Sequence, residues 1–151
     1  MKDYTEFQFG WIIFVIMIPL QIMIFYFYLN DIGDRPLETN GFLIINLIII
    51  LIYSLFYGMT TRITDDSIRL SFGIGLIRKT IQLNQIMTIE TVKNPWYFGW
   101  GVRFIPNGML YNITGTAAIE LKFKHTNKVF RIGSKDPLKL KQEIEKGLSA
   151  K

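Results

Sequence analysis

The chain of 151 residues contains no cysteine and only one histidine, His125. Without cysteine it has neither disulfides nor thiolate zinc sites, and nothing in it suggests an oxidising compartment. His125 lies in a predicted turn beside Lys124 and Lys128, with no second histidine to complete a metal-binding set. Because the single histidine lies in a predicted turn with no evident group to orient it, no Ser-His-acid arrangement for nucleophilic catalysis can be assembled. We therefore expect no metal, no cofactor and no catalytic residue, and a protein that is not an enzyme.

Two long stretches, Trp11–Leu29 and Gly41–Tyr57, lack charged residues altogether. They contain 19 and 17 residues, and crossing the hydrocarbon core of a bilayer takes about 20, with about 17 as the lower limit. A charged side chain at the bilayer centre costs about 2.5–3.5 kcal/mol on insertion scales, so its absence is a selective signature. The first stretch is too long for the apolar region of a signal peptide, and no small-residue cleavage site follows it. We predict a hairpin of two transmembrane helices within residues 1–59 and one soluble domain over residues 60–151.

Acidic residues are scarce in the second part of the chain. Residues 60–151 carry 15 basic and seven acidic side chains, a net charge of +8, whereas residues 1–59 carry two basic and five acidic ones, a net charge of −3. Basic residues accumulate on the cytoplasmic side of a membrane protein during insertion. The basic residues that follow the second apolar stretch are Arg62, Arg69, Arg78 and Lys79. We expect a multi-pass protein of the cell membrane with both termini in the cytoplasm.

Few polar side chains interrupt the two apolar stretches. Gln21 and Asn46 lie at similar depths when counted from the loop between the two predicted helices. Amides that face one another across membrane helices contribute about 0.6–2 kcal/mol to association. A polar path for a substrate is the alternative, but two amides without an ionisable group make a poor path. We interpret Gln21 and Asn46 as helix–helix contacts, and either lipid or a second copy of the chain could cover the outer faces of the hairpin.

The spacing of apolar residues changes after Gly58. Ile68, Leu70 and Phe72 alternate with polar residues, and so do Ile119, Leu121 and Phe123, which is typical of half-buried strands. Turn-forming residues separate many of the alternating segments. The eight predicted strands cover residues 60–64, 67–72, 76–82, 86–92, 101–105, 109–113, 117–124 and 128–132.

One amphipathic helix is predicted at the end of the chain. Asp136 is a suitable N-cap and Pro137 suits the first helical position. Leu140, Ile144 and Leu148 recur every four residues and need a sheet to cover them. The expected architecture is an α+β, mainly-β domain, in which a meandering antiparallel sheet or barrel is closed by one C-terminal helix.

The order of these elements resembles that of small bacterial membrane proteins with a pleckstrin-homology-like (PH-like) domain. The resemblance covers about residues 58–148. The segments that carry it are Gly75–Leu83, Ile86–Glu90, Gly101–Arg103, Tyr111–Ile113 and Arg131–Pro137. It implies a PH-like fold behind a membrane hairpin, and it implies little about activity.

An aromatic segment interrupts the strand pattern. Trp96, Tyr97, Phe98 and Trp100 lie around Gly99, where strand signals are weakest. Large rings in a loop suggest an exposed surface that contacts a membrane or a protein. The alternative is that these rings plug the open end of a barrel.

Basic residues on different predicted strands form the other candidate surface. They are Lys93, Arg103, Lys122, Lys124, Lys128 and Arg131. A domain tethered at the membrane lies within a Debye length of anionic headgroups, where each basic residue contributes about 1 kcal/mol to binding. The alternative is a solvated face combined with the usual cytoplasmic excess of basic residues. Nucleic acid is not an expected partner, because no recognition motif accompanies the charge.

Together these features favour an integral membrane protein whose PH-like domain acts as a non-enzymatic protein-interaction or scaffold module at the inner leaflet. Tethering would raise its effective concentration for a membrane-associated protein partner. Two alternatives stay open at this point. One is a sensor of anionic lipid headgroups that uses the basic residues, and the other is a membrane enzyme or small transporter.

Overall fold

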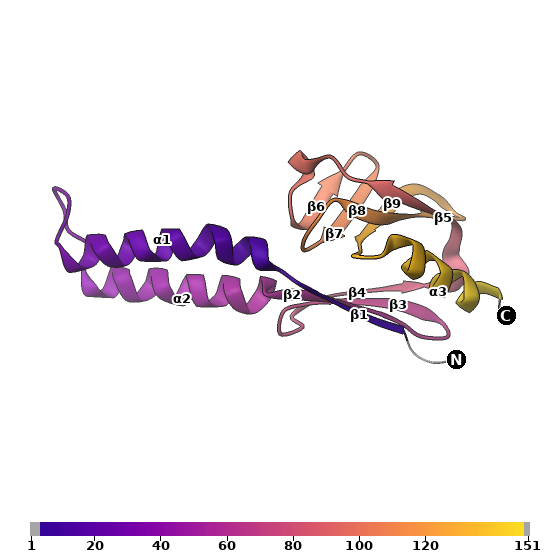
Figure 1. The fold of residues 1–151 in the computed structure, drawn as a ribbon, viewed down its shortest axis with the longest axis horizontal. Coiled ribbons are helices and arrows are strands. Elements are labelled where there is room, and N and C mark those ends of the chain that lie inside the picture. Colours follow the sequence, from indigo (N-terminus) through magenta and orange to yellow (C-terminus); the bar gives the residue numbers. More distant parts are fainter. Residues whose placement is uncertain (1–3, 150–151) are drawn as a thin grey trace.

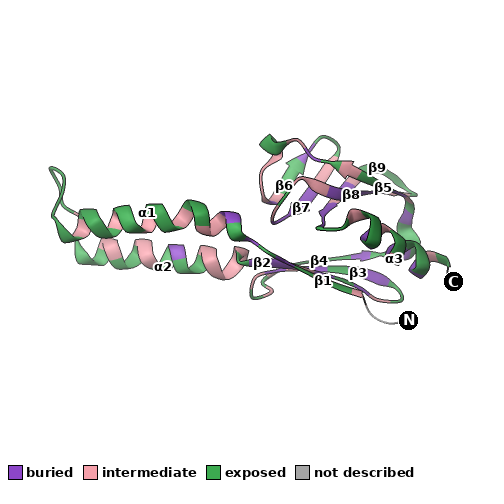
Figure 2. Cartoon of the chain, viewed as in Figure 1, coloured by how far each residue is buried: buried purple, intermediate pink, exposed green. Residues whose placement is uncertain are grey.

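Two long helices project from a body of strands in the structure, a computed structural model that describes residues 4–149 (Figure 1). They are α1 (Trp11–Leu29) and α2 (Thr39–Phe56). Both are long and apolar enough to cross a membrane. Only Ile12 and Ile49 within them are buried (Figure 2). Helix α2 begins two residues before the predicted stretch and ends one residue before its end.

The body contains nine strands within the described residues, two short 3-10 helices and one further α-helix. The strands are β1 (Tyr4–Phe9), β2 (Gly58–Ile63), β3 (Ser67–Phe72), β4 (Ile77–Gln82), β5 (Ile86–Lys93), β6 (Gly101–Ile105), β7 (Gly108–Asn112), β8 (Ala117–Phe123) and β9 (Thr126–Gly133). All eight predicted strands are present, each within two residues of its expected bounds. The short helices are η1 (Leu83–Gln85) and η2 (Trp96–Phe98).

The C-terminal helix α3 (Pro137–Ser149) begins where its capping signal predicts. The backbone N–H of Lys139 donates to Oδ1 of Asp136 over 3.0 Å, which is the N-cap bond expected of an aspartate. Leu140 and Ile144 are fully buried. The predicted helix is therefore confirmed, together with the face that it buries.

The strands form two sheets and do not close into a barrel. The first sheet is antiparallel with the order β1-β2-β3-β4, and the second has the order β5-β8-β9-β7-β6. Strand β7 pairs with β9 in parallel, from Gly108 opposite Val129 to Tyr111 opposite Ile132. The expected single antiparallel meander or barrel is thus wrong in two respects, because the strands divide between two sheets and the second sheet is mixed.

Strand β1 was not expected from the sequence. It pairs with β2 along its whole length, from Tyr4 opposite Ile63 to Phe9 opposite Gly58. The hairpin is therefore inserted between two neighbouring strands of the same sheet. The side chains that β1 turns inward are Tyr4, Glu6 and the buried Gln8, whereas Phe7 and Phe9 are exposed. Glu6, Phe7, Gln8 and Phe9 do alternate, but the run is short and would assign Phe7 and Phe9, not Gln8, to the buried face.

Polar side chains of β1 bind the segment that follows β9. The Gln8 amide donates to the Gly133 carbonyl over 2.8 Å. The carboxylate of Glu6 accepts one bond from the Ser134 hydroxyl and one from the Lys135 backbone N–H, each over 2.8 Å. These bonds connect the β1 edge of the first sheet to the end of the second sheet.

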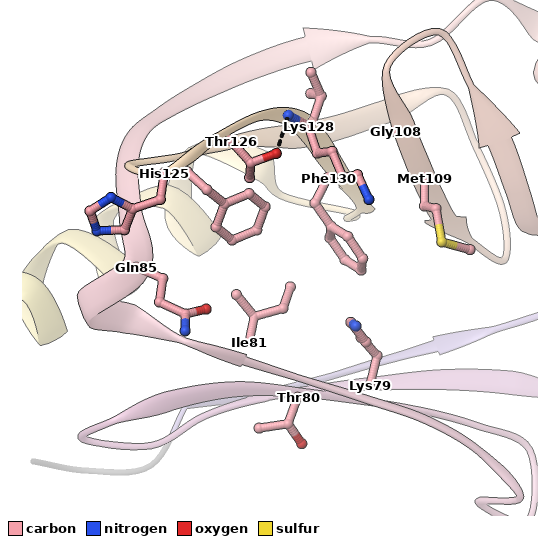
Figure 3. Close-up of a pocket in the computed structure, with 12 residues that line it drawn as sticks. Lys79, Thr80, Ile81, Gln85, Gly108, Met109, His125, Thr126, Lys128 and Phe130 are labelled. Atoms are coloured by element: carbon pink, nitrogen blue, oxygen red, sulfur yellow. Dashed lines mark hydrogen bonds between the residues drawn. The ribbon is translucent and has the colours of Figure 1, made fainter.

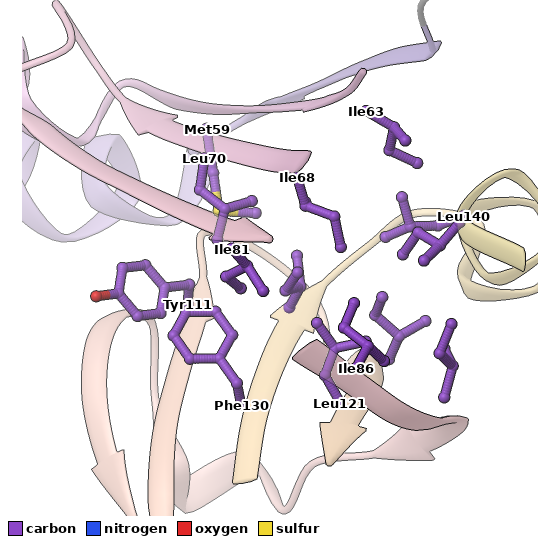
Figure 4. Close-up of a cluster of buried hydrophobic side chains, with 14 of the residues drawn as sticks. Met59, Ile63, Ile68, Leu70, Ile81, Ile86, Tyr111, Leu121, Phe130 and Leu140 are labelled. Atoms are coloured by element: carbon purple, nitrogen blue, oxygen red, sulfur yellow. The ribbon is translucent and has the colours of Figure 1, made fainter. Parts of the chain in front are cut away.

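The main hydrophobic core lies between the two sheets and beneath α3 (Figure 4). Helix α3 contacts β2 of the first sheet and β5 and β8 of the second, so it covers one open end between them. Each large apolar side chain that becomes fully buried contributes about 1.5–3 kcal/mol. The completely inaccessible members of this core are Met59, Ile68, Phe72, Leu83, Ile119, Leu121, Ile132, Leu140 and Ile144.

Replacing Glu6 tests whether β1 is fastened to the second sheet. We expect Glu6→Ala to lower the free energy of unfolding by about 1–3 kcal/mol, because the Ser134 and Lys135 donors lose their shared acceptor. The exposed Thr5→Ala in the same strand should change it by less than about 0.5 kcal/mol. Chemical unfolding of the detergent-solubilised protein, followed by tryptophan fluorescence, measures both. Equal stability of the two variants would contradict the assignment.

The ionisation of Tyr4 lowers the stability of the fold at alkaline pH. Burial, followed by the nearby carboxylate of Glu6, raises the pKa of Tyr4 from 10.0 to about 12. The fold favours the neutral phenol, so its contribution is complete below pH 10 and is lost as the pH rises towards 12. Tyr4→Phe should therefore flatten the loss of stability in that window, whereas the exposed Tyr97→Phe should not. Unfolding midpoints at stepped pH values provide the measurement.

Candidate interaction site

Gln21 and Asn46, the predicted helix–helix contacts of the hairpin, bind each other. Nε2 of Gln21 donates to Oδ1 of Asn46 over 2.5 Å, and Nδ2 of Asn46 donates to the Phe42 carbonyl over 2.9 Å. The amides thus use their donors within the helix pair. This geometry holds α1 and α2 together and satisfies polar groups that lipid could not.

The aromatic segment forms a loop on the second sheet rather than a plug. Trp96 is 79% exposed and Tyr97 is 68% exposed, which is incompatible with rings that fill the end of a closed barrel. Phe98 is half-buried, and the guanidinium of Arg131 lies over its ring, 6.0 Å from the centroid. Trp100 is also half-buried and lies towards the base of the hairpin. Two rings of the loop, Trp96 and Tyr97, are therefore exposed to solvent, and the other two, Phe98 and Trp100, pack partly against the domain.

A buried ion pair holds this loop on the sheet. Nε of Arg131 donates to Oε2 of Glu120 over 2.7 Å, and Nη1 donates to Oδ1 of Asn94 over 3.0 Å. The side chain of Glu120 is only 11% exposed. Arg131 is its closest cationic partner, and Nζ of Lys122 lies 3.9 Å from its other oxygen. Arg131 thus joins β8, β9 and the start of the aromatic loop.

The candidate basic residues do not lie on one continuous face. Gly101 lies next to Phe56 and Gly10 next to Ile113, so the β6 and β7 ends that hold Gly101 and Asn112 are at the hairpin end. The registers of β7, β9 and β8 then place the β8–β9 turn at the opposite end of the sheet.

The six side chains divide accordingly. Lys93 pairs in register with Ala117 at the hairpin end, and Lys124 and Lys128 lie at the far end. Lys122 binds Glu90 over 3.2 Å, and Arg131 binds Glu120. Arg103 is exposed on β6. Contact of these residues with anionic lipid stays a prediction. Lys93 lies at the hairpin end, and Arg103 and Arg131 lie level with each other, both in register with Leu110.

A groove of about 480 Å³ opens between the edge strand β4 and the far ends of β7 and β9 (Figure 3). Ile81 of the first sheet and Phe130 of the second point towards each other across it. Its lining is mostly apolar, with cationic and polar groups among the residues. The lining residues are Lys79, Thr80, Ile81, Gln85, Gly108, Met109, Phe123, His125, Thr126, Lys128, Val129 and Phe130.

Two exposed lysines lie on the inner, core-facing sides of the sheets at this groove. Lys79 is opposite the buried Leu70 and lies between Ile77 and Ile81 on the same side of β4. Lys128 lies on the same side of β9 as Phe130, two residues away. An inward-pointing charge on an edge strand discourages unspecific pairing with other strands. A strand that carries carboxylates opposite these two lysines would neutralise their charges, so its pairing would not be discouraged in this way.

The groove therefore has the chemistry of a site for an extended polypeptide segment. The free edge of β4 supplies backbone hydrogen-bonding groups, as in other strand-addition interfaces. Ile81, Met109 and Phe130 provide an apolar floor, and Lys79 and Lys128 provide positive charge. Within residues 4–149, no cluster of three or more His, Asp or Glu side chains could hold a metal ion.

No family model, no curated protein and no solved structure matches this chain. The PH-like identity thus has no support from relatives.

Most of the groove could not be recognised from the sequence. Among its lining residues only Lys128 is a sequence candidate, and there as a lipid contact. One usable signal is Lys79, because it interrupts the apolar positions Ile77 and Ile81 on the face that the alternation assigns to the core. Which strand faces it depends on sheet topology, which alternation does not encode.

Arg131→Ala tests the attachment of the aromatic loop. We expect it to lower the free energy of unfolding by about 3 kcal/mol, because Glu120 keeps a buried charge without its closest partner. Amide hydrogen exchange of residues 96–100 should also become faster. Lys128→Ala, on the exposed end of the same strand, is the control and should change stability by less than about 0.5 kcal/mol. Similar results for the two variants would show that the ion pair does not hold the loop.

Proposed function

We propose that this protein is a non-enzymatic interaction module anchored in the cell membrane. Its domain binds an extended, acidic segment of a membrane-associated protein in the groove beside β4. The groove carries this proposal, because it combines a free strand edge, an apolar floor and two inward-facing lysines. Backbone pairing would provide affinity, and the pockets and charges would select the sequence.

The hairpin supplies the location in this proposal. Two helices of suitable length and hydropathy support membrane anchoring, and the basic residues after α2 favour a domain and termini in the cytoplasm. Confinement to the membrane plane raises the effective concentration of the groove for a partner in the same membrane. A modest affinity of the groove would then suffice for a stable complex.

The PH-like interpretation is part of the same proposal. It is supported by a four-stranded antiparallel sheet that precedes a second sheet, and by a C-terminal helix that covers one open end between them. Sensing of anionic lipid through one basic face has less support, because the candidate residues divide between the two ends of the second sheet. A membrane enzyme or small transporter remains the least supported alternative.

Selection from a random peptide library tests the groove directly. The full-length protein in lipid nanodiscs should enrich peptides with an acidic residue two positions away from an apolar residue on each side, which places all three on one face of the bound strand. The double variant Lys79→Glu/Lys128→Glu should weaken binding of a selected peptide by about tenfold or more, since both attractions become repulsions. Fluorescence anisotropy of the labelled peptide measures the affinity.

The matched control is Arg62→Glu/Arg69→Glu. These two arginines are exposed and lie opposite each other on the outer face of the first sheet. The control makes the same change of charge away from the groove and should leave the affinity unchanged. Failure to enrich any peptide, or equal weakening by both double variants, would refute the proposed site.

A further inference from the structure

A second hollow lies where the domain meets the hairpin. It has a volume of about 550 Å³ and lies between the first turns of α1 and the segment that leads into β6. Its helical wall comes from α1, with Ile12, Ile13 and Ile16, and from α2, with Ile52 and Phe56. Trp100 and Val102 belong to its domain wall. None of its lining residues belongs to the groove beside β4. The two sites are therefore separate.

Within residues 4–149, Arg103 is the one charged residue that lines this hollow. Its Nε donates to the Trp100 carbonyl over 2.9 Å, which fixes the base of the guanidinium. The side chain is exposed, so the terminal Nη groups remain accessible at the rim. A guanidinium held in this way can bind two oxygens of a phosphate at once.

The hollow lies at the level where a bilayer would begin. Trp11 is the first residue of α1, and Ile16 follows five residues later, about 7.5 Å further along the helix axis. The helical wall is thus part of the segment that would enter the hydrocarbon region. The exposed rings of Trp96 and Tyr97 belong to the same loop as Trp100, and such rings favour the boundary between headgroups and acyl chains.

We propose that this hollow holds one phospholipid of the cytoplasmic leaflet, with an acyl chain along α1 and its phosphate on Arg103. Apolar walls that continue from a membrane helix suit an acyl chain, and a single cation at the rim suits one phosphate. Lipids with a net negative charge are preferred, because no acidic side chain lines the hollow. The inference rests on the hairpin spanning the bilayer, as proposed above, and does not depend on the peptide groove.

Quenching by brominated lipids tests this site in the full-length protein. Trp11→Phe/Trp96→Phe leaves Trp100 as the only tryptophan. In phosphatidylcholine nanodiscs, a small fraction of brominated phosphatidylglycerol should quench Trp100 with an apparent affinity about fivefold higher than brominated phosphatidylcholine, as expected for one basic residue near the surface. Arg103→Gln should remove this preference, and Arg103→Lys should restore part of it. Lys93→Gln, at the same end of the sheet but outside the hollow, should retain it.

The possible outcomes separate this inference from the membrane anchor. Equal quenching by both lipids, unchanged in Arg103→Gln, would mean contact with bulk lipid only and would overturn the site. A protein that retains only Trp11 reports on the hairpin. If Trp11 is quenched and Trp100 is not, the lipid site is refuted and the anchor stands; if neither is quenched, both fail. Peptide binding in the β4 groove should be the same in Arg103→Gln as in the unmodified protein.

Discussion

The pairing of β1 with β2 is the constraint on which the arrangement of this molecule depends. Six consecutive residue pairs join the two strands, and both strands continue directly into the hairpin. One residue, Gly10, separates β1 from α1, and one residue, Tyr57, separates α2 from β2. The Gly10 N–H donates to the Tyr57 carbonyl over 2.8 Å. A β-carbon at position 10 would collide with the Phe56 carbonyl oxygen, so this close approach requires glycine. The domain is a continuation of the hairpin and has no flexible linker.

The turn between β3 and β4 reinforces this junction. The backbone N–H of Ile74 donates to the Ser54 carbonyl over 3.0 Å. Ser54 belongs to the last turn of α2, whose carbonyls lack partners within the helix. Unpaired carbonyls are costly near hydrocarbon, where water is scarce. Gly73 allows the contact, because a side chain there would meet the backbone of Ser54 and Leu55. The β3–β4 turn of the first sheet thus caps the C-terminal end of α2.

The elements of this fold follow from local patterns in the sequence, whereas their partners do not. Uncharged apolar stretches predict α1 and α2, and alternation predicts eight strands. Strand β1 was not predicted, because its inward residues Glu6 and Gln8 are polar. Their hydrogen-bond partners, Ser134 and Gly133, lie more than 120 residues away. The parallel pairing of β7 with β9 and the open side of β4 depend on long-range topology, which alternation does not specify. The groove lies at this open side. The sequence therefore contains Lys79 and Lys128 but does not predict that they meet at one site.

A rigid junction changes what membrane anchoring does for a binding site. A flexible tether spreads a site over many heights above the bilayer, and its effective concentration falls as the linker lengthens. Here the groove lies at the far end of β7, whose opposite end adjoins the hairpin. Five residues at about 3.3 Å each separate the two ends by about 16 Å along the strand. The orientation of β4 is fixed at the same time. If the groove binds a partner segment as proposed, that segment pays little additional entropy for alignment, and the anchor would then select partners by geometry as well as by proximity.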